Sequence, residues 1–204
     1  MKDAEIREQF HRQKLRHYRS TQDTRVLDEL GLMHGSCRAD IAVVNGRLLG
    51  YEIKSDQDTL NRLERQIPAY DAIFDAVTLI VSDKHRVAAT RRAPKHWGVI
   101  ISARDKNGEI KFRTGRKAKS NPNVDPLSLT RLLWRNEAAQ ILTGIDANYA
   151  STHLPRAALY AKLADTLSLR KLKETVRSYL KKRKDWRGQT QPSPDGGLFQ
   201  PISK

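Results

Sequence analysis

The 204-residue sequence has little of what several protein classes require. Cys37 is its one cysteine, which excludes an internal disulfide and fits a reducing compartment. No apolar run approaches the roughly 20 residues that span a bilayer, and residues 1–14 are too charged for a secretory signal. The six histidines have no zinc-type spacing, and no glycine-rich phosphate loop is present. We therefore expect a cytoplasmic protein with no membrane association.

The sequence is rich in lysine and arginine, and its charge is unevenly distributed along the chain. The formal net charge is +15, which favours a polyanionic partner because bound phosphates release condensed counterions. Residues 26–83 hold ten acids against five bases, whereas residues 84–119 hold twelve bases and two acids, and residues 151–187 hold eleven and three. An acidic centre between basic arms suits a metal-dependent enzyme on nucleic acid. DNA is therefore the expected partner, and a basic protein without such a ligand is the alternative.

Hydrophobic spacing predicts an α/β order of elements. Apolar positions at helical spacing predict helices over residues 3–19, 60–74 and 84–92. Alternating or β-branched runs predict strands over residues 38–44, 47–54, 77–81 and 99–102, while residues 25–33 are ambiguous between a strand and a short helix. A further hairpin is expected at residues 106–108, returning through 110–112. Helices and strands in this order indicate an α/β sandwich.

Three local features refine this order. Asn45-Gly46 is the preferred pair for a type I′ turn and predicts a tight hairpin between the strands at 38–44 and 47–54. Asp56 or Asp58 is expected to cap the helix that follows, and for Asp56 this role is favoured over metal ligation. Pro68 should kink or divide that helix, because proline removes a helical hydrogen bond.

Composition divides the chain into three parts. Residues 1–115 form the α/β domain, residues 124–187 a small basic helical module, and residues 188–204 a loose tail rich in proline and glycine. Helices of the module are expected over residues 127–142, 155–163 and 169–184. Phosphate contact is predicted for the basic run at its end, with an aromatic residue available for stacking: Lys181, Lys182, Arg183, Lys184 and Trp186. A solvated basic helix face is the alternative.

The residues that suggest chemistry are Asp40 and the tripeptide Glu52-Ile53-Lys54, on the two arms of the predicted hairpin. Because side chains alternate along a strand, Glu52 and Lys54 should share a face, which Asp40 can reach from the partner strand. Two carboxylates there can hold Mg²⁺, which prefers oxygen ligands, polarises a phosphate and lowers the pKa of a bound water. The lysine ammonium can orient that water or stabilise the charge that develops on the phosphate.

The tripeptide alone is weak evidence, since a second copy, Glu109-Ile110-Lys111, occurs in the same chain. Its nearest upstream acid, Asp105, lies across a short turn rather than within a partner strand, and no amphipathic helix follows. We interpret the second copy as a solvated hairpin.

In its full context the first copy resembles the site of the PD-(D/E)XK nuclease superfamily. The order helix, strand, Asp strand, Glu-x-Lys strand, helix, strand is similar to that of the family. The motifs that carry the resemblance are Arg38-Ala39-Asp40, Glu52-Ile53-Lys54-Ser55-Asp56, and Gln66-Ile67-Pro68-Ala69-Tyr70, which matches the Gln-x-x-x-Tyr element of the RecB-type branch. Residues 26–85 also resemble small bacterial and phage proteins assigned to this superfamily, which share an EIKSD-like strand and an LWR-type helix like Leu133-Trp134-Arg135. One departure is that no proline precedes Asp40.

The resemblance implies a restriction-endonuclease-like fold, a mixed sheet flanked by helices, and a DNA phosphodiesterase that needs Mg²⁺ or Mn²⁺. Asp40 and Glu52 would be metal ligands with the Ile53 carbonyl as a third, and Lys54 would be the catalytic lysine. The cytoplasm would then be that of a bacterium, or of the host cell if a phage encodes the protein. A homodimer or a protein partner is compatible with this reading.

The remaining roles have open alternatives. Gln66 and Tyr70 would contact nucleic acid or support the site, but Gln66 could be solvated and Tyr70 plain core. Glu29 could be a further ligand or simply exposed, and Arg38 would support nucleic-acid binding. Asp40 and Lys54 could instead form a structural ion pair. The whole scaffold could also be a catalytically silent module that binds nucleic acid or protein.

Overall fold

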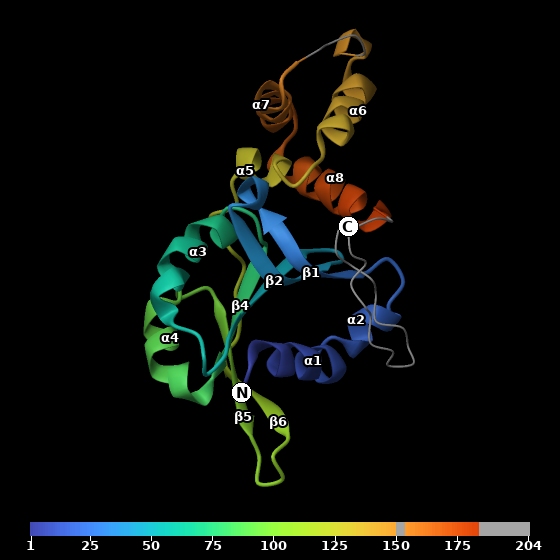
Figure 1. Ribbon diagram of the computed structural model, residues 1–204. Helices are drawn as coiled ribbons and strands as arrows, with labels where there is room; N and C mark the ends of the chain where they lie inside the picture. Colours follow the sequence, from blue (N-terminus) through green and yellow to red (C-terminus); the bar gives the residue numbers. More distant parts are fainter. Residues whose placement is uncertain (150–153, 184–204) are drawn as a thin grey trace, which may run out of the picture.

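The computed structural model describes residues 1–149 and 154–183, and its centre is a six-stranded sheet (Figure 1). The strands lie side by side in sequence order: β1 (Arg25–Leu32), β2 (Cys37–Val44), β3 (Leu48–Lys54), β4 (Ala76–Ser82), β5 (Gly98–Arg104) and β6 (Ile110–Arg116). Neighbours β3, β4 and β5 are parallel, whereas β1, β2 and β6 run antiparallel to the strands they pair with. The α/β class with a mixed sheet flanked by helices is confirmed.

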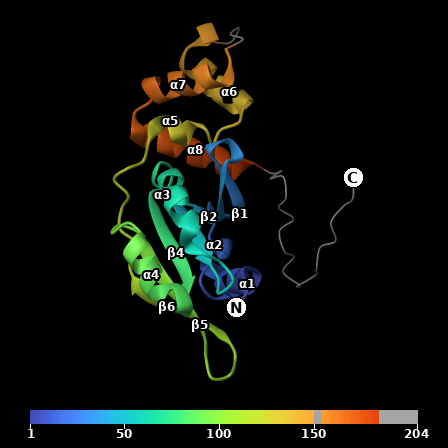
Figure 2. The ribbon, with the colours of Figure 1, turned by 60° about the vertical axis from the view of Figure 1, so that its left-hand side comes forward.

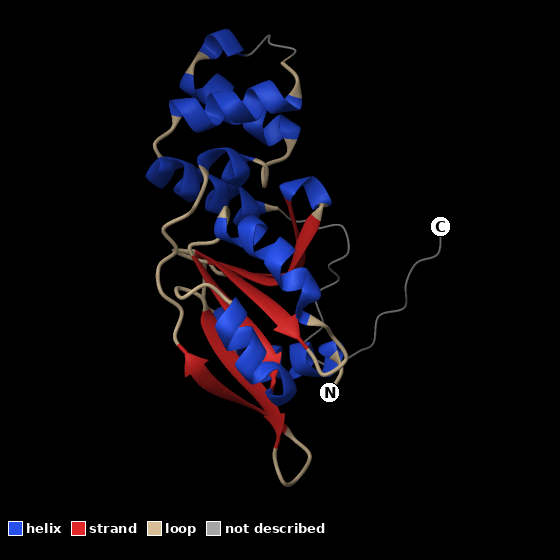
Figure 3. Cartoon of the chain, turned by 90° about the vertical axis from the view of Figure 1, so that its left-hand side faces the viewer, coloured by secondary structure: helices blue, strands red, loops and turns tan. Residues whose placement is uncertain are grey.

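Helices cover both faces of the sheet and extend beyond one end of it. Figures 1 and 2 show α1 (Asp3–Gln13) and α2 (Arg16–Ser20) on one face and α3 (Leu63–Asp71) and α4 (Arg86–Arg92) on the other. The C-terminal helices stack beyond the end of the sheet (Figure 3): α5 (Pro126–Thr130), α6 (Arg135–Ile145), α7 (Arg156–Thr166) and α8 (Leu169–Lys182). Short 3-10 turns complete the described elements: η1 (Met33–Gly35), η2 (Leu60–Arg62), η3 (Asp83–His85) and η4 (Ala147–Tyr149). None of the described helices is long and apolar enough to span a bilayer.

Two apolar clusters hold these layers together, one on each face of the sheet. The smaller cluster packs Ile6 and Phe10 of α1 against Ile53 of β3. The larger one runs without a break from the α3 face of the sheet into the C-terminal helices, where Leu163 and Val176 are among its members. The basic helical part therefore shares its core with the sheet, and each fully buried side chain of this kind stabilises the joint by about 1.5 to 3 kcal/mol.

Most predicted elements are present, with shifts at their ends. The ambiguous residues 25–33 form β1, and the predicted helix at 3–19 is divided into α1 and α2 around Leu15, which stays buried. The predicted helix at 127–142 is also divided, because Asp125 caps α5 and a second N-terminal cap at Trp134 starts α6. α3 continues through Pro68 to Asp71 and is not divided there.

Two local predictions were wrong. Neither Asn45 nor Gly46 has the positive φ of a type I′ turn; the Asn45 side chain accepts the Arg47 N–H (2.8 Å), giving a three-residue connection. Asp56 and Asp58 do not cap α3, which begins at Leu63 without a side-chain cap. Asp56 accepts from the terminal ammonium of Met1 instead (2.5 Å), and Asp58 accepts from the N–H and hydroxyl of Ser55.

Candidate active site

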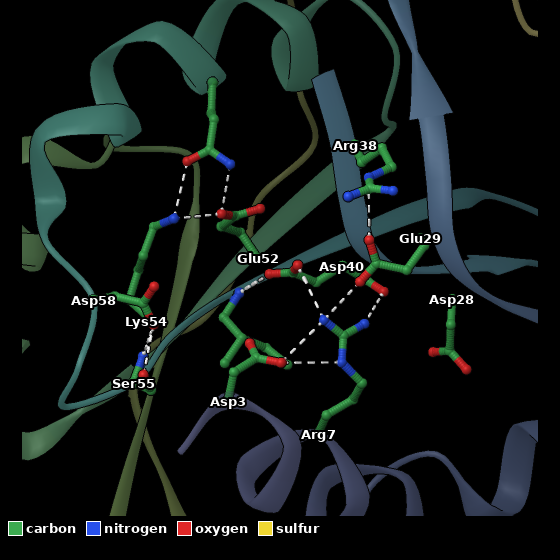
Figure 4. A network of polar contacts seen from close by, with 12 residues as sticks. Asp3, Arg7, Asp28, Glu29, Arg38, Asp40, Glu52, Lys54, Ser55 and Asp58 are labelled. Carbon is green, nitrogen blue, oxygen red and sulfur yellow. Dashed lines mark hydrogen bonds and ion pairs between the residues drawn. The ribbon is translucent and has the colours of Figure 1, made fainter. Parts of the chain in front are cut away.

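The β2–β3 hairpin opens at the residues that the sequence singled out. Backbone pairing runs from Val44 opposite Leu48 to Ile41 opposite Tyr51 and stops there. The next free N–H, that of Ile53, donates to Asp40 Oδ2 at 2.6 Å. A side-chain carboxylate thus takes the place of a backbone acceptor, and this fixes Asp40 beside Glu52 where the strands separate (Figure 4).

Glu52 and Lys54 face α3, as the alternation of the strand predicts. Ile53 between them is buried in the cluster on the opposite face. Lys54 Nζ lies 2.6 Å from Glu52 Oε1, and each residue is only 2% exposed. The ion pair of Lys54 is therefore with Glu52 and not with Asp40, which was the structural alternative considered above.

Two side chains from α3 complete the contacts of this pair. Gln66 accepts from Lys54 Nζ at 3.0 Å and donates through Nε2 to Glu52 Oε1 at 2.6 Å. Tyr70, four residues on and therefore on the same side of the helix, donates its hydroxyl to Glu52 Oε2. Burial and the charge of Glu52 raise the pKa of Tyr70 well above its usual range, so the phenol stays a donor. Both residues belong to the site, and Tyr70 is also fully buried core.

Arg7 of α1 is a site residue that the sequence analysis missed. Its guanidinium donates to the Asp40 carbonyl (2.6 Å) and to Asp40 Oδ1 (3.1 Å), and it pairs with Asp3 and with Glu29 at 2.9 Å. One cation thus joins carboxylates from α1, β1 and β2 (Figure 4). A signal was available, because Arg7 follows the buried Ile6 and so lies at the edge of the apolar stripe of α1.

The charged form of Asp40 is disfavoured in this site, chiefly because the carboxylate is buried. Burial and, secondly, the charge of Glu52 raise the pKa of Asp40 to about 7, while the Ile53 N–H and Arg7 act in the opposite direction. On the neighbouring strand β1, Glu29 has a left-handed backbone with φ of 53°, between the residues that pair with Ala39 and Ile41. Burial of the Cys37 thiol and the charge of Glu52 raise the pKa of Cys37. This argues against a thiolate nucleophile.

The donor atoms suit a hard cation, although the number of carboxylates is small. Asp40 and Glu52 supply oxygen atoms, which Mg²⁺ and Mn²⁺ prefer. Within residues 1–149 and 154–183 there is no group of three or more His, Cys, Asp or Glu side chains arranged to hold a metal. The third ligand would have to be a backbone oxygen such as that of Ile53. Burial disfavours the charged form of Asp40, and a cation bound there would offset that penalty, so the donor chemistry of Asp40 and Glu52 fits such an ion.

Other predicted residues lie outside this centre. Arg38 is exposed and pairs with Glu29 at 3.3 Å, at the rim of the acidic cluster. The second Glu-x-Lys copy is the solvated hairpin expected, with Glu109 and Lys111 paired at 2.6 Å on side chains that are 65% and 55% exposed.

The basic run at the end of α8 differs from its prediction. Arg183 is buried, pairs with Glu137, donates to the Leu132 carbonyl and stacks on Trp134 with its guanidinium carbon 4.4 Å from the ring centroid. It is therefore part of the fold and not a phosphate contact. Lys181 pairs with Asp23 at 2.6 Å. Lys182 is exposed, and Lys184 and Trp186 lie outside the described residues, as does the predicted tail at 188–204.

Comparisons with known proteins place this chain beside a bacteriophage protein. The model of the family described as bacteriophage P4 protein cII matches residues 4–189. Protein cII of Enterobacteria phage P4 is 29% identical to the chain over 161 residues, which is 79% of this chain and 60% of that protein. The chain thus spans about three fifths of the length of this relative. No solved structure matches it.

Proposed function

The chain belongs to the bacteriophage P4 protein cII family, and we propose that it is a metal-dependent nuclease with a restriction-endonuclease-like fold that hydrolyses phosphodiester bonds of DNA. One observation carries this proposal: the buried pair Glu52–Lys54 lies beside Asp40 at the point where β2 and β3 separate. A buried ion pair contributes little net stability, since apolar residues of similar volume are often as good. The buried pair is therefore better explained by a catalytic role than by a stabilising one.

Each residue has a definite task in the proposed reaction. Asp40 and Glu52 would hold Mg²⁺ or Mn²⁺, and the ion would supply an activated water and polarise the phosphate. Lys54 would place its ammonium against the charge that develops on the phosphate. Gln66 and Tyr70 orient Glu52 through its two oxygens, and Arg7 holds Asp40 in position.

The test is cleavage of linear, circular and single-stranded DNA with Mg²⁺ or Mn²⁺. We expect Lys54→Ala and Asp40→Ala to lower the rate by a factor on the order of 100 or more, as for the loss of one group that stabilises a transition state. Lys111→Ala is the matched control, because it removes a lysine from the same tripeptide at the exposed hairpin and should leave the rate unchanged. Robust cleavage by both site variants would refute the proposal.

A catalytically silent module that binds nucleic acid or protein is the second candidate, and one observation favours it. Both oxygens of Asp40 already accept hydrogen bonds, from Ile53 and Arg7, and both oxygens of Glu52 are also engaged. A site that is fully satisfied by its own residues can be purely structural. This candidate predicts salt-sensitive DNA binding with no turnover in any metal, in the same assay.

A further inference from the structure

The residues at the end of α4 and the segment that follows β6 lie side by side, joined by the Lys119 N–H and the His96 carbonyl, and both segments carry exposed cations. Five lysine and arginine side chains, which we call the α4 patch, are all exposed: Arg91, Arg92, Lys95, Lys117 and Lys119. None of the five forms an ion pair with any residue in the part of the chain that the structure describes. Like charges held together repel one another, so an arrangement of this kind favours a polyanion.

The patch is held in shape by its backbone. The N–H of Lys119 donates to the His96 carbonyl at 2.8 Å, which fastens the segment after β6 to the residues that follow α4. Arg116 strengthens the same joint, since its guanidinium donates to the carbonyls of Trp97 (2.7 Å) and Pro94 (2.8 Å). The two backbone segments that carry the five cations are therefore held together before any ligand binds.

The patch is also tied to the helix that serves the candidate active site. Asp71 at the end of α3 accepts from Trp97 Nε1 at 2.6 Å and contacts His96 at 3.0 Å. Gln66 lies five residues earlier on α3, which at about 1.5 Å per residue is about 8 Å along the helix axis. Figure 2 shows α3 and α4 side by side on the same face of the sheet. A ligand on the patch is thus placed toward one end of α3.

The C-terminal helix offers a contrast, although it is just as rich in basic residues. Four cations at the end of the chain are engaged in the fold: Lys173 and Arg177 with Asp75, Lys181 with Asp23, and Arg183 with Glu137. These contacts attach α8 to the sheet and to α6. The positive charge of α8 is therefore largely used to fasten the helix to the protein.

We propose that the α4 patch, and not α8, holds the phosphate backbone of a DNA duplex. The inference rests on the proposed function only in taking DNA as the polyanion. A duplex fits better than a single strand, because single strands are held by stacking on aromatic rings and the patch has none. Of the large apolar side chains exposed in the described residues, only Val87 lies on α4. Duplex DNA also has the higher linear charge density.

The test is binding of a fluorescein-labelled DNA duplex and of one of its strands, measured by fluorescence anisotropy in EDTA between about 50 and 200 mM salt. The patch variant Arg91→Gln/Arg92→Gln/Lys95→Gln removes three unpaired cations. The matched control Arg170→Gln/Lys171→Gln/Lys182→Gln removes three exposed cations from α8. All six positions are on the surface, so both variants should fold, which circular dichroism checks.

We expect the patch variant to bind the duplex at least about tenfold more weakly, with a salt slope shallower by about 2 to 3, since each phosphate contact contributes about 0.9. The control should stay close to wild type, and the duplex should bind more tightly than the strand. Wild-type affinity in the patch variant, an equal loss in the control, or no binding by the wild type would overturn the inference. Duplex binding through the patch without cleavage in Mg²⁺ or Mn²⁺ would refute the proposed function and leave this inference standing.

Discussion

Replacing Lys54 by methionine tests whether the buried ion pair at the centre of the site exists. Methionine keeps much of the volume and removes the ammonium that lies 2.6 Å from Glu52 Oε1 and 3.0 Å from Gln66 Oε1. Removing one partner of a buried pair costs about 3 to 5 kcal/mol, because the other charge is left without compensation. Glu52 retains donors from Gln66 and Tyr70, so we expect the lower end, about 3 kcal/mol.

The free energy of unfolding from urea titrations measures this loss, and a double-mutant cycle assigns it to the pair. Glu52→Gln/Lys54→Met removes both charges, while the side-chain amide introduced at position 52 can still accept the Tyr70 hydroxyl. The double variant should therefore recover about 2 kcal/mol relative to Lys54→Met alone. Lys111→Met, at the exposed copy of the tripeptide, should leave the free energy of unfolding close to that of the wild type. If Lys54→Met matches that control, the pair is not buried and the account of the site is wrong.

Two further predictions concern the scaffold. Gly50→Ala should lower the free energy of unfolding by about 1 to 3 kcal/mol, because the new Cβ would lie 2.6 Å from the Phe74 ring. Gly46→Ala is the control: its Cβ would meet open space, so it should be nearly neutral in the same urea titration. Arg183→Ala should cost about 3 kcal/mol by leaving Glu137 buried and unpaired, which a thermal melt would show as a lowered midpoint; an unchanged midpoint would contradict the assigned structural role.

The sequence predicts the centre of the candidate site well, because short-range patterns within single strands and helices place its residues. Strand alternation places Glu52 and Lys54 on one face, and a turn between two apolar runs brings Asp40 to the neighbouring strand. Helical spacing places Gln66 and Tyr70 together on α3. These five side chains meet in the structure because the two-residue repeat of the strand and the 3.6-residue repeat of the helix already place them on facing sides.

What the sequence does not predict depends on contacts between distant residues. Arg7 contacts Asp40 across 33 positions: its place beside Ile6 puts it at the edge of the apolar stripe of α1, but no local pattern indicates which carboxylate it meets. Arg183 belongs to a run of four basic residues for which phosphate contact was predicted, yet it pairs with Glu137, 46 positions earlier. Asp56 is a plausible cap in sequence, but its carboxylate accepts from the terminal ammonium of Met1 instead. Charge alone therefore misassigned the role of Arg183.

The two Glu-x-Lys copies show why position carries more weight than sequence at this site. Both pairs have the same 2.6 Å contact between Nζ and a carboxylate oxygen, but Lys54 and Glu52 have side chains 3% exposed, against 55% and 65% for Lys111 and Glu109. Solvent screens the exposed pair and separates its charges at little cost. Burying the other pair carries a penalty of several kcal/mol per ion, which the attraction and the bonds from Gln66 and Tyr70 only offset. Folding alone does not favour such an arrangement, and this supports the proposed role of the buried pair in acting on a phosphate.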